Sequence, residues 1–110
     1  MQSLMKILDI GHRNHSVDTA MSILETTVSD AIYGGNIRAI KVIHGHGKGA
    51  LRNAVREWCE YQSGRFLAVI YGEDYDLFHK DTADMRAACG HPRDHDLGKN
   101  NRAVTYIWLQ

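Results

Sequence analysis

The chain has 110 residues, and its 13 Lys and Arg balance 13 Asp and Glu, so the formal net charge at pH 7 is zero. A neutral chain does not attract nucleic acid or anionic lipid as a whole, so binding to either requires a local patch. The length fits one domain over residues 1–110, and the apolar runs are far shorter than the roughly 20 residues that cross a bilayer.

The cysteines and the N-terminal composition indicate the compartment. Cys59 and Cys89 are too few for a disulfide framework, and the pattern of a signal peptide is not visible. We therefore expect a cytoplasmic protein without a membrane role. Cys89, His91 and His95 do not match the spacing of a common structural zinc motif, so no metal site is predicted there.

Hydrophobic periodicity predicts alternating strands and helices along the chain. Ser16 is the expected N-cap of the first helix, and Gly34 and Gly35 end it. The predicted strands cover residues 4–10, 38–43, 66–71 and 103–109. The first main helix has its apolar face from Val17 to Ile32, before the two glycines, and the second covers residues 50–61. The order β-α-β-α-β-β indicates an α/β fold, a two-layer sandwich with a mostly parallel or mixed four-stranded sheet.

The last two strands are separated by about 30 residues, more than a structureless connection in a compact domain usually has. We interpret residues 72–98 as an insertion or extended connection. Asp81 is the expected cap of a short helix that reaches Cys89 and is closed by Gly90 and Pro92, with polar loop beyond it.

A glycine-rich loop joins the second strand to the second helix and is the clearest candidate site. Its glycines allow positive φ and close approach of a ligand, while the helix dipole favours an anion. This predicts a phosphate site, although a tight turn that binds nothing is the simpler alternative. Lys48, Arg52 and Arg56 lie four residues apart. This spacing is typical of a stripe that follows phosphates, and equally of a solvated helix face. The predicted phosphate-binding residues are Gly45, His46, Gly47, Lys48, Gly49 and Arg52.

Asp9 and His44 end the first two strands, and parallel pairing of those strands would make them neighbours. His44 can contact a phosphate, act as general acid or base, or hold the loop through backbone groups. Asp9 can orient a histidine, hold a water or bind a divalent ion such as Mg²⁺. The simpler role for Asp9 is to cap the turn that follows it.

Three stretches of the sequence together resemble the small MutS-related (Smr) domain. They are Leu8-Asp9-Ile10 before an amphipathic helix, the run from Val42 to Arg52 containing His-Gly-His-Gly, and the final strand from Asn101 to Leu109. The resemblance implies a fold similar to the C-terminal domain of translation initiation factor three, and binding or nicking of DNA or RNA. Such domains occur alone or at the C-terminus of MutS-like ATPases, and some cut messenger RNA at stalled ribosomes. The expected partners are therefore DNA or RNA, with the rest of a MutS-like chain or the ribosome.

The first motif departs from the family pattern. Family members read L-D-x-H-G or L-D-x-R, whereas here Gly11 stands at the His or Arg position and His12 follows. His12 or His15 can replace the missing side chain, and the catalytic set implied for an endonuclease is then Asp9, His12 and His44. A non-catalytic nucleic-acid module and a protein-interaction domain that uses residues 72–98 are the alternatives.

Overall fold

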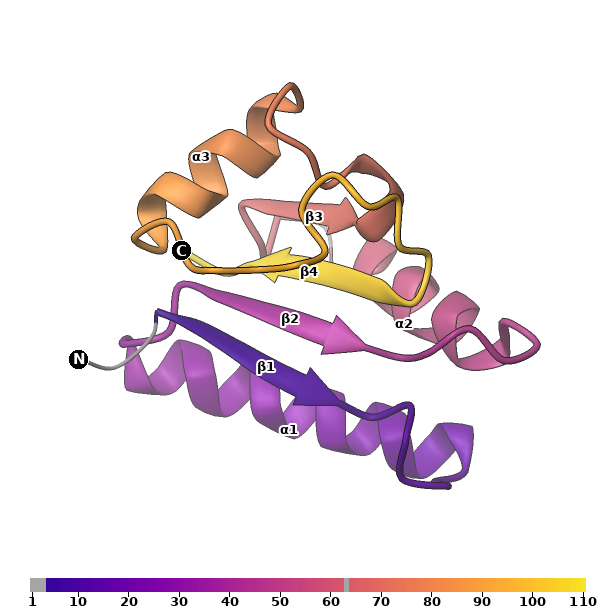
Figure 1. Ribbon diagram of the computed structural model, residues 1–110. Helices are drawn as coiled ribbons and strands as arrows, with labels where there is room; N and C mark the ends of the chain where they lie inside the picture. The colour runs from indigo at the N-terminus through magenta and orange to yellow at the C-terminus, as the bar shows by residue number, and fades with distance from the viewer. Residues whose placement is uncertain (1–3, 63) are drawn as a thin grey trace.

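The computed structural model describes residues 4–62 and 64–110, and the strands in those residues form one four-stranded sheet (Figure 1). The predicted order of elements is confirmed, and the expected short helix lies between the last two strands. The elements are β1 (Met5–Asp9), α1 (Val17–Gly34), β2 (Ala39–Ile43), α2 (Ala50–Glu60), β3 (Ala68–Tyr71), the 3-10 helix η1 (Gly72–Asp74), α3 (Lys80–Ala88) and β4 (Val104–Trp108).

The sheet is mixed, as predicted, with strand order β1-β2-β4-β3. β1 and β2 are parallel, whereas β4 runs antiparallel to both β2 and β3. The last strand of the chain therefore lies inside the sheet. Asp9 pairs with Ile43, and Ile43 pairs with Val104, so the ends of β1 and β2 meet the start of β4 at one end of the sheet.

Helices α1 and α2 pack on one face of the sheet and form the larger core. Ser16 caps α1 by accepting a hydrogen bond from the Thr19 amide, and Gly35, at φ 74°, ends that helix in the left-handed conformation. Both predicted boundaries of α1 are thus confirmed. The fully buried side chains of this core include Leu24, Val28, Ile40, Val42, Val55 and Ile107.

A second, smaller core lies on the other face, beneath α3 and the loop of residues 91–102, which we call the closing loop (Figure 1). Tyr75 stacks on Tyr106 of β4 with ring centroids 3.9 Å apart, and Met85 of α3 is fully buried beside them. The sheet with α1 and α2 on one face forms the predicted two-layer sandwich. On the other face, α3 and the closing loop add a partial third layer.

The cap of α3 differs from the prediction. His79, not Asp81, is the N-cap residue, and its Nδ1 accepts a hydrogen bond from the Thr82 amide. The helix begins at Lys80, so Asp81 lies in its first turn. A carboxylate there interacts favourably with the helix dipole but does not cap the helix. An imidazole nitrogen substitutes for the usual hydroxyl or carboxylate oxygen, which explains why composition alone pointed to the wrong residue.

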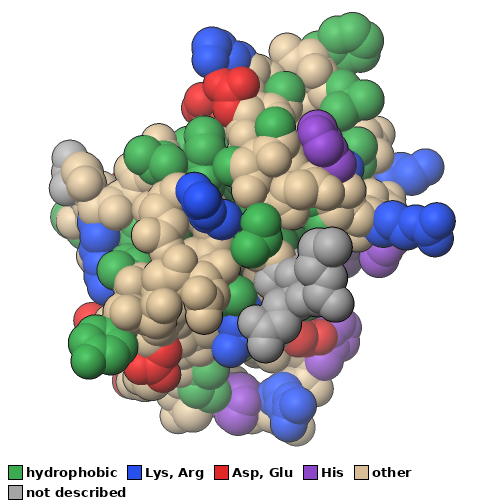
Figure 2. All heavy atoms as spheres, turned by 90° about the vertical axis from the view of Figure 1, so that its left-hand side faces the viewer, with side chains coloured by type: hydrophobic (Ala, Val, Ile, Leu, Met, Phe, Trp, Pro, Cys, Tyr) green, Lys and Arg blue, Asp and Glu red, His purple; other side chains and the backbone are tan. Residues whose placement is uncertain are grey.

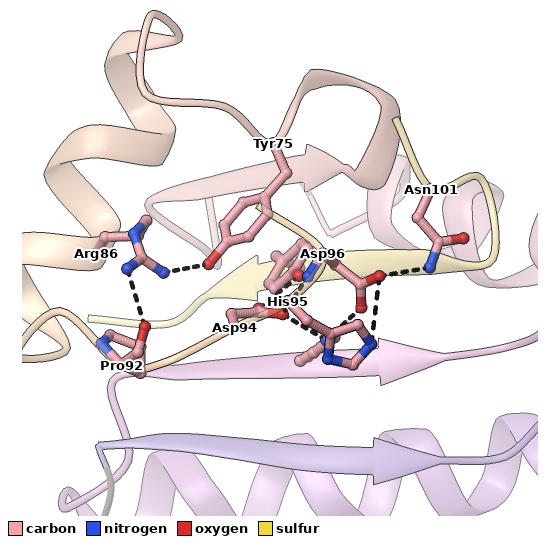
Figure 3. A network of polar contacts seen from close by, with 9 residues as sticks. Tyr75, Arg86, Pro92, Asp94, His95, Asp96 and Asn101 are labelled. Carbon is pink, nitrogen blue, oxygen red and sulfur yellow. Dashed lines mark hydrogen bonds and ion pairs between the residues drawn. The ribbon is translucent and has the colours of Figure 1, made fainter. Parts of the chain in front are cut away.

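A buried lysine fixes the closing loop to the centre of the sheet through Asp94 and Asp96, which are labelled in Figure 3. Lys41 of β2 donates to Asp94 at 2.7 Å and to Asp96 at 2.5 Å, and its side chain is only 5% exposed. Tyr106 donates to the other oxygen of Asp94, at 2.7 Å. Burial opposes charge on all three ionisable groups, but their hydrogen bonds raise the pKa of Lys41 and lower the pKa of both carboxyls. All three are therefore charged at neutral pH.

The cysteines are free thiols buried on opposite faces of the sheet. Burial raises the pKa of Cys59 to about 12, so this thiol stays protonated and unreactive at neutral pH. None of the helices in residues 4–62 and 64–110 combines the length and the apolar content that a bilayer crossing requires.

Replacing Lys41 with Met should destabilise the protein by about 3–5 kcal/mol, because two buried carboxylates lose their cation. Urea unfolding would measure this cost. The matched control is Lys6→Met on the exposed face of β1, which should change the free energy of unfolding by less than about 0.5 kcal/mol. Adding Asp94→Asn and Asp96→Asn to Lys41→Met should recover part of the loss, and equal stability of the two lysine variants would contradict this role.

Candidate nucleic-acid interface

Three loops meet at the end of the sheet where β1 and β2 finish and β4 begins (Figure 1). Backbone hydrogen bonds join them directly. The Ile43 carbonyl accepts from the amides of Ile10 and Gly11, at 2.9 and 3.0 Å. The Ala103 carbonyl accepts from the amides of His44 and Gly45, at 3.0 and 3.1 Å. The glycine loop, residues 44–49, is therefore held from both sides by its neighbours.

Gly11 packs against the glycine loop so closely that a side chain has no room. A Cβ at position 11 would lie 2.6 Å from the carbonyl carbon of His44 and 2.9 Å from the amide nitrogen of Gly45. Both neighbours are backbone atoms, which cannot turn aside as a side chain could. This contact explains why glycine stands where a histidine or arginine was expected.

The imidazole of His12, the residue after Gly11, lies next to the carboxylate of Asp9. Its Nδ1 donates to Asp9 Oδ2 at 2.6 Å, while Asp9 Oδ1 accepts from the amides of Gly11 and His12 at 3.0 and 3.2 Å. Partial burial of Asp9 opposes ionisation, but these hydrogen bonds outweigh it and lower the pKa of the carboxyl. The ionised Asp9 fixes the orientation of His12, whose side chain is 73% exposed and whose Nε2 is left for a ligand.

His44 lies beneath the glycine loop, and its ring contacts Gly45 and Thr105. It is 5% exposed, and its Nδ1 donates to the Gly45 carbonyl at 3.2 Å while its Nε2 contacts Thr105 Oγ1 at 2.9 Å. Burial, with the nearby positive charges of Arg56 and Arg52, lowers the pKa of His44 to about 4. A neutral imidazole with both nitrogens engaged favours the loop-holding role among those predicted for His44.

The glycine loop places the N-terminus of α2 toward solvent. Gly45, Gly47 and Gly49 have φ values of 78°, 41° and 87°, all in the left-handed region that the sequence led us to expect. Gly49 is the N-cap of α2 and no side chain caps the helix there, so the first amides of α2 have no capping side chain as an acceptor. The Gly45 amide, in contrast, already donates to Ala103, so this residue shapes the loop rather than offering a donor.

The three basic residues of the predicted stripe, one from the glycine loop and two from α2, divide into two groups. Lys48 is exposed. Arg52 lies over the loop: its guanidinium is so close to Gly49 that a Cβ on that glycine would lie 2.5 Å from it. Arg56 instead turns inward to form a two-pronged ion pair with Glu73, at 2.7 and 2.9 Å, and donates to Thr105 Oγ1 at 3.0 Å. The interpretation of a three-residue phosphate stripe is therefore wrong for Arg56.

A cleft of about 340 Å³ opens between the glycine loop and the closing loop. His46 of the glycine loop and His95 and Asn101 of the closing loop line it, together with His12 and Ile43. His95 and Asn101 were not predicted as site residues. Residues 93–101 have no periodic pattern, so only the polar character of that loop could have indicated a surface role.

Among the described residues, one group of three potential metal ligands lies close together, and it consists of Asp94, His95 and Asp96. Both carboxylates already bind the ammonium group of Lys41, so this group is a lysine site rather than a cation site. Asp9 also fits a divalent ion poorly, because both its oxygens accept hydrogen bonds from N–H groups. No step is therefore assigned to a metal at either position.

The family was tested by comparison with known proteins. A sequence model of the Smr domain matches residues 10–72, more than half of the chain. The chain belongs to the Smr domain family. The crystal structure of the Smr domain of Thermus thermophilus MutS2 matches with a TM-score of 0.61 and 21% identity, over 96% of this chain and 98% of that chain. No curated protein matches.

The structural match shows that the Smr fold extends across almost the whole chain. The family match itself covers the glycine loop and α2 but ends at Gly72. The closing loop, with His95 and Asn101, thus lies outside the residues that identify this chain as an Smr domain.

Gly11→Ala should destabilise this Smr domain by about 1–3 kcal/mol, because the new methyl group overlaps the backbone between His44 and Gly45. Thermal or urea unfolding would give the change in free energy. Gly34→Ala is the matched control, since a Cβ there meets nothing within 4 Å. A Gly11→Ala protein as stable as the control would show that the two loops do not pack as described.

Proposed function

We propose that this Smr domain binds nucleic acid through backbone phosphates held at the glycine loop. The observation that carries the proposal is the placement of charge. Residues 11–16, 44–49 and 97–102 meet at one end of the sheet, and they contain no Asp or Glu in a chain whose net charge is zero. Exposed cations there are Arg13, Lys48, Lys99 and Arg102.

The opposite end of the molecule has a different surface. Figure 2 shows acidic and basic side chains interspersed with hydrophobic ones on that side. Asp9 and Glu73 at the same end are paired with His12 and Arg56. The exposed cations of the three loops therefore direct a polyanion to one place, because exposed charges farther than about 10 Å are largely screened at moderate salt.

The phosphate is bound by the amides of the α2 first turn, with Lys48 and Arg52 beside them. Helix N-termini favour anions through the helix dipole and unpaired amides, and the left-handed glycines let the backbone approach the phosphate closely. His46 extends this surface toward the cleft.

Cleavage of the bound strand is the reaction that the pair of Asp9 and His12 supports. On RNA, His12 Nε2 accepts the proton of a 2′-hydroxyl, and the 2′-oxygen attacks phosphorus while the bond to the 5′-oxygen breaks. The products are a 2′,3′-cyclic phosphate and a 5′-hydroxyl, whose oxygen takes its proton from water. Asp9 stabilises the resulting imidazolium, and the loop amides stabilise the charge on phosphorus. On DNA a water must replace the 2′-oxygen as nucleophile.

A non-catalytic binding module is the second candidate, and His44 supplies the observation that favours it. This histidine is buried and neutral at pH 7, so it does not supply the acid that protonates a leaving oxygen. In that role the domain would recruit nucleic acid to a larger MutS-like ATPase chain or to the ribosome.

Incubation with labelled single-stranded RNA and DNA, with magnesium and with EDTA, separates the two candidates. We expect RNA cleavage in EDTA that falls at least about 100-fold in both His12→Ala and Asp9→Asn. The first removes the general base, and the second removes the carboxylate that orients it and stabilises its imidazolium. His15→Ala, which removes an exposed imidazole of the same loop, should cleave at the wild-type rate. If the wild-type protein binds the strands but does not cleave them, cleavage is contradicted and the non-catalytic binding module is the function.

A further inference from the structure

The cleft beside the glycine loop has the features of a binding site for one flat heterocycle. Its volume of about 340 Å³ is at the lower end of the range for small-ligand pockets, about 300–1,000 Å³. The imidazoles of His12, His46 and His95 line it, and Ile43 and Val104 contribute apolar surface. Aromatic rings around an apolar floor are suited to stacking of a nucleobase.

The far wall of the cleft is fixed without a ligand. Asn101 donates to Asp96 at 2.8 Å and accepts from the Ala103 amide at 2.9 Å. Asp96 is itself held by Lys41, and Figure 3 shows His95 next to Asp96, with 3.8 Å between His95 Nε2 and Asp96 Oδ1. His95 thus stands on an ordered segment, yet its own side chain is 92% exposed and available to a ligand.

The charges of the cleft select a base over a phosphate. The charged residues Lys41 and Asp96 both line the cleft and are paired with each other, so the lining offers no unpaired lysine or arginine to a phosphate. An uncharged base needs no such partner. The adjoining glycine loop has no acidic residue, so the backbone and the base of one strand have separate, adjacent surfaces.

We propose that this cleft binds the nucleobase next to the phosphate on the glycine loop, with His95 stacking on it. The proposal rests on the proposed nucleic-acid function and adds a base subsite to it. Gly45 and His46 belong to both the loop and the cleft, so a nucleoside attached to the bound phosphate reaches the cleft directly. A base in the cleft must leave its helical stack, so the site selects single strands over duplexes.

Binding of fluorescein-labelled DNA and RNA hexanucleotides, and of an abasic DNA hexamer, tests the base subsite by fluorescence anisotropy. His95→Ala should weaken binding of DNA and RNA about fivefold or more, as expected for one lost stacking contact. His95→Phe should restore it. The control is His91→Asn, which removes an exposed imidazole outside the cleft at a φ of 53° that Asn tolerates.

The abasic hexamer identifies the contact. His95→Ala and wild type should bind it equally, since it has no base to stack. Equal binding of normal hexamers by wild type and His95→Ala would overturn the base subsite while leaving the phosphate site standing. A loss confined to RNA, or equal on abasic DNA, would overturn it also, because the contact would then be to sugar or phosphate. Failure of the wild-type protein to bind any hexamer would instead overturn the proposed function.

Discussion

The candidate interface depends on three backbone segments that meet without a side chain between them. Gly11 touches the peptide between His44 and Gly45, and the Ala103 carbonyl accepts from both of their amides. The register of β1, β2 and β4 brings these segments to the same end of the sheet. Every functional assignment for the glycine loop follows from this contact, because it sets where the loop and α2 point.

Buried side chains support these loops, and exposed ones are left for a ligand. Thr105 accepts from Arg56 and contacts His44, so β4, α2 and the glycine loop are connected under the surface. Lys41 does the same for the closing loop through its two aspartates. A buried network in which every polar group has a partner costs much less free energy than one with an unpaired member. It also holds a loop in one conformation.

The elements were predictable from sequence because periodicity, caps and glycines are local signals, as Ser16 and Gly35 show for α1. The glycine loop was also predictable, since positive φ is a property of its own residues. Pairings across long sequence distances were not predictable. Nothing near Arg56 indicates that it binds Glu73, and nothing near Lys41 indicates Asp94, because those contacts depend on how the strands are ordered.

The salt dependence of oligonucleotide binding tests the central claim, phosphate binding at the glycine loop, most directly. Plots of log K against log salt concentration should be shallower by about 0.7 for Lys48→Ala and for Arg52→Ala, as expected for one lost phosphate contact on a single strand. Lys80→Ala, on the exposed surface of α3, should leave the slope unchanged. A wild-type affinity that does not vary with salt, or equal slopes for all four proteins, would contradict the account.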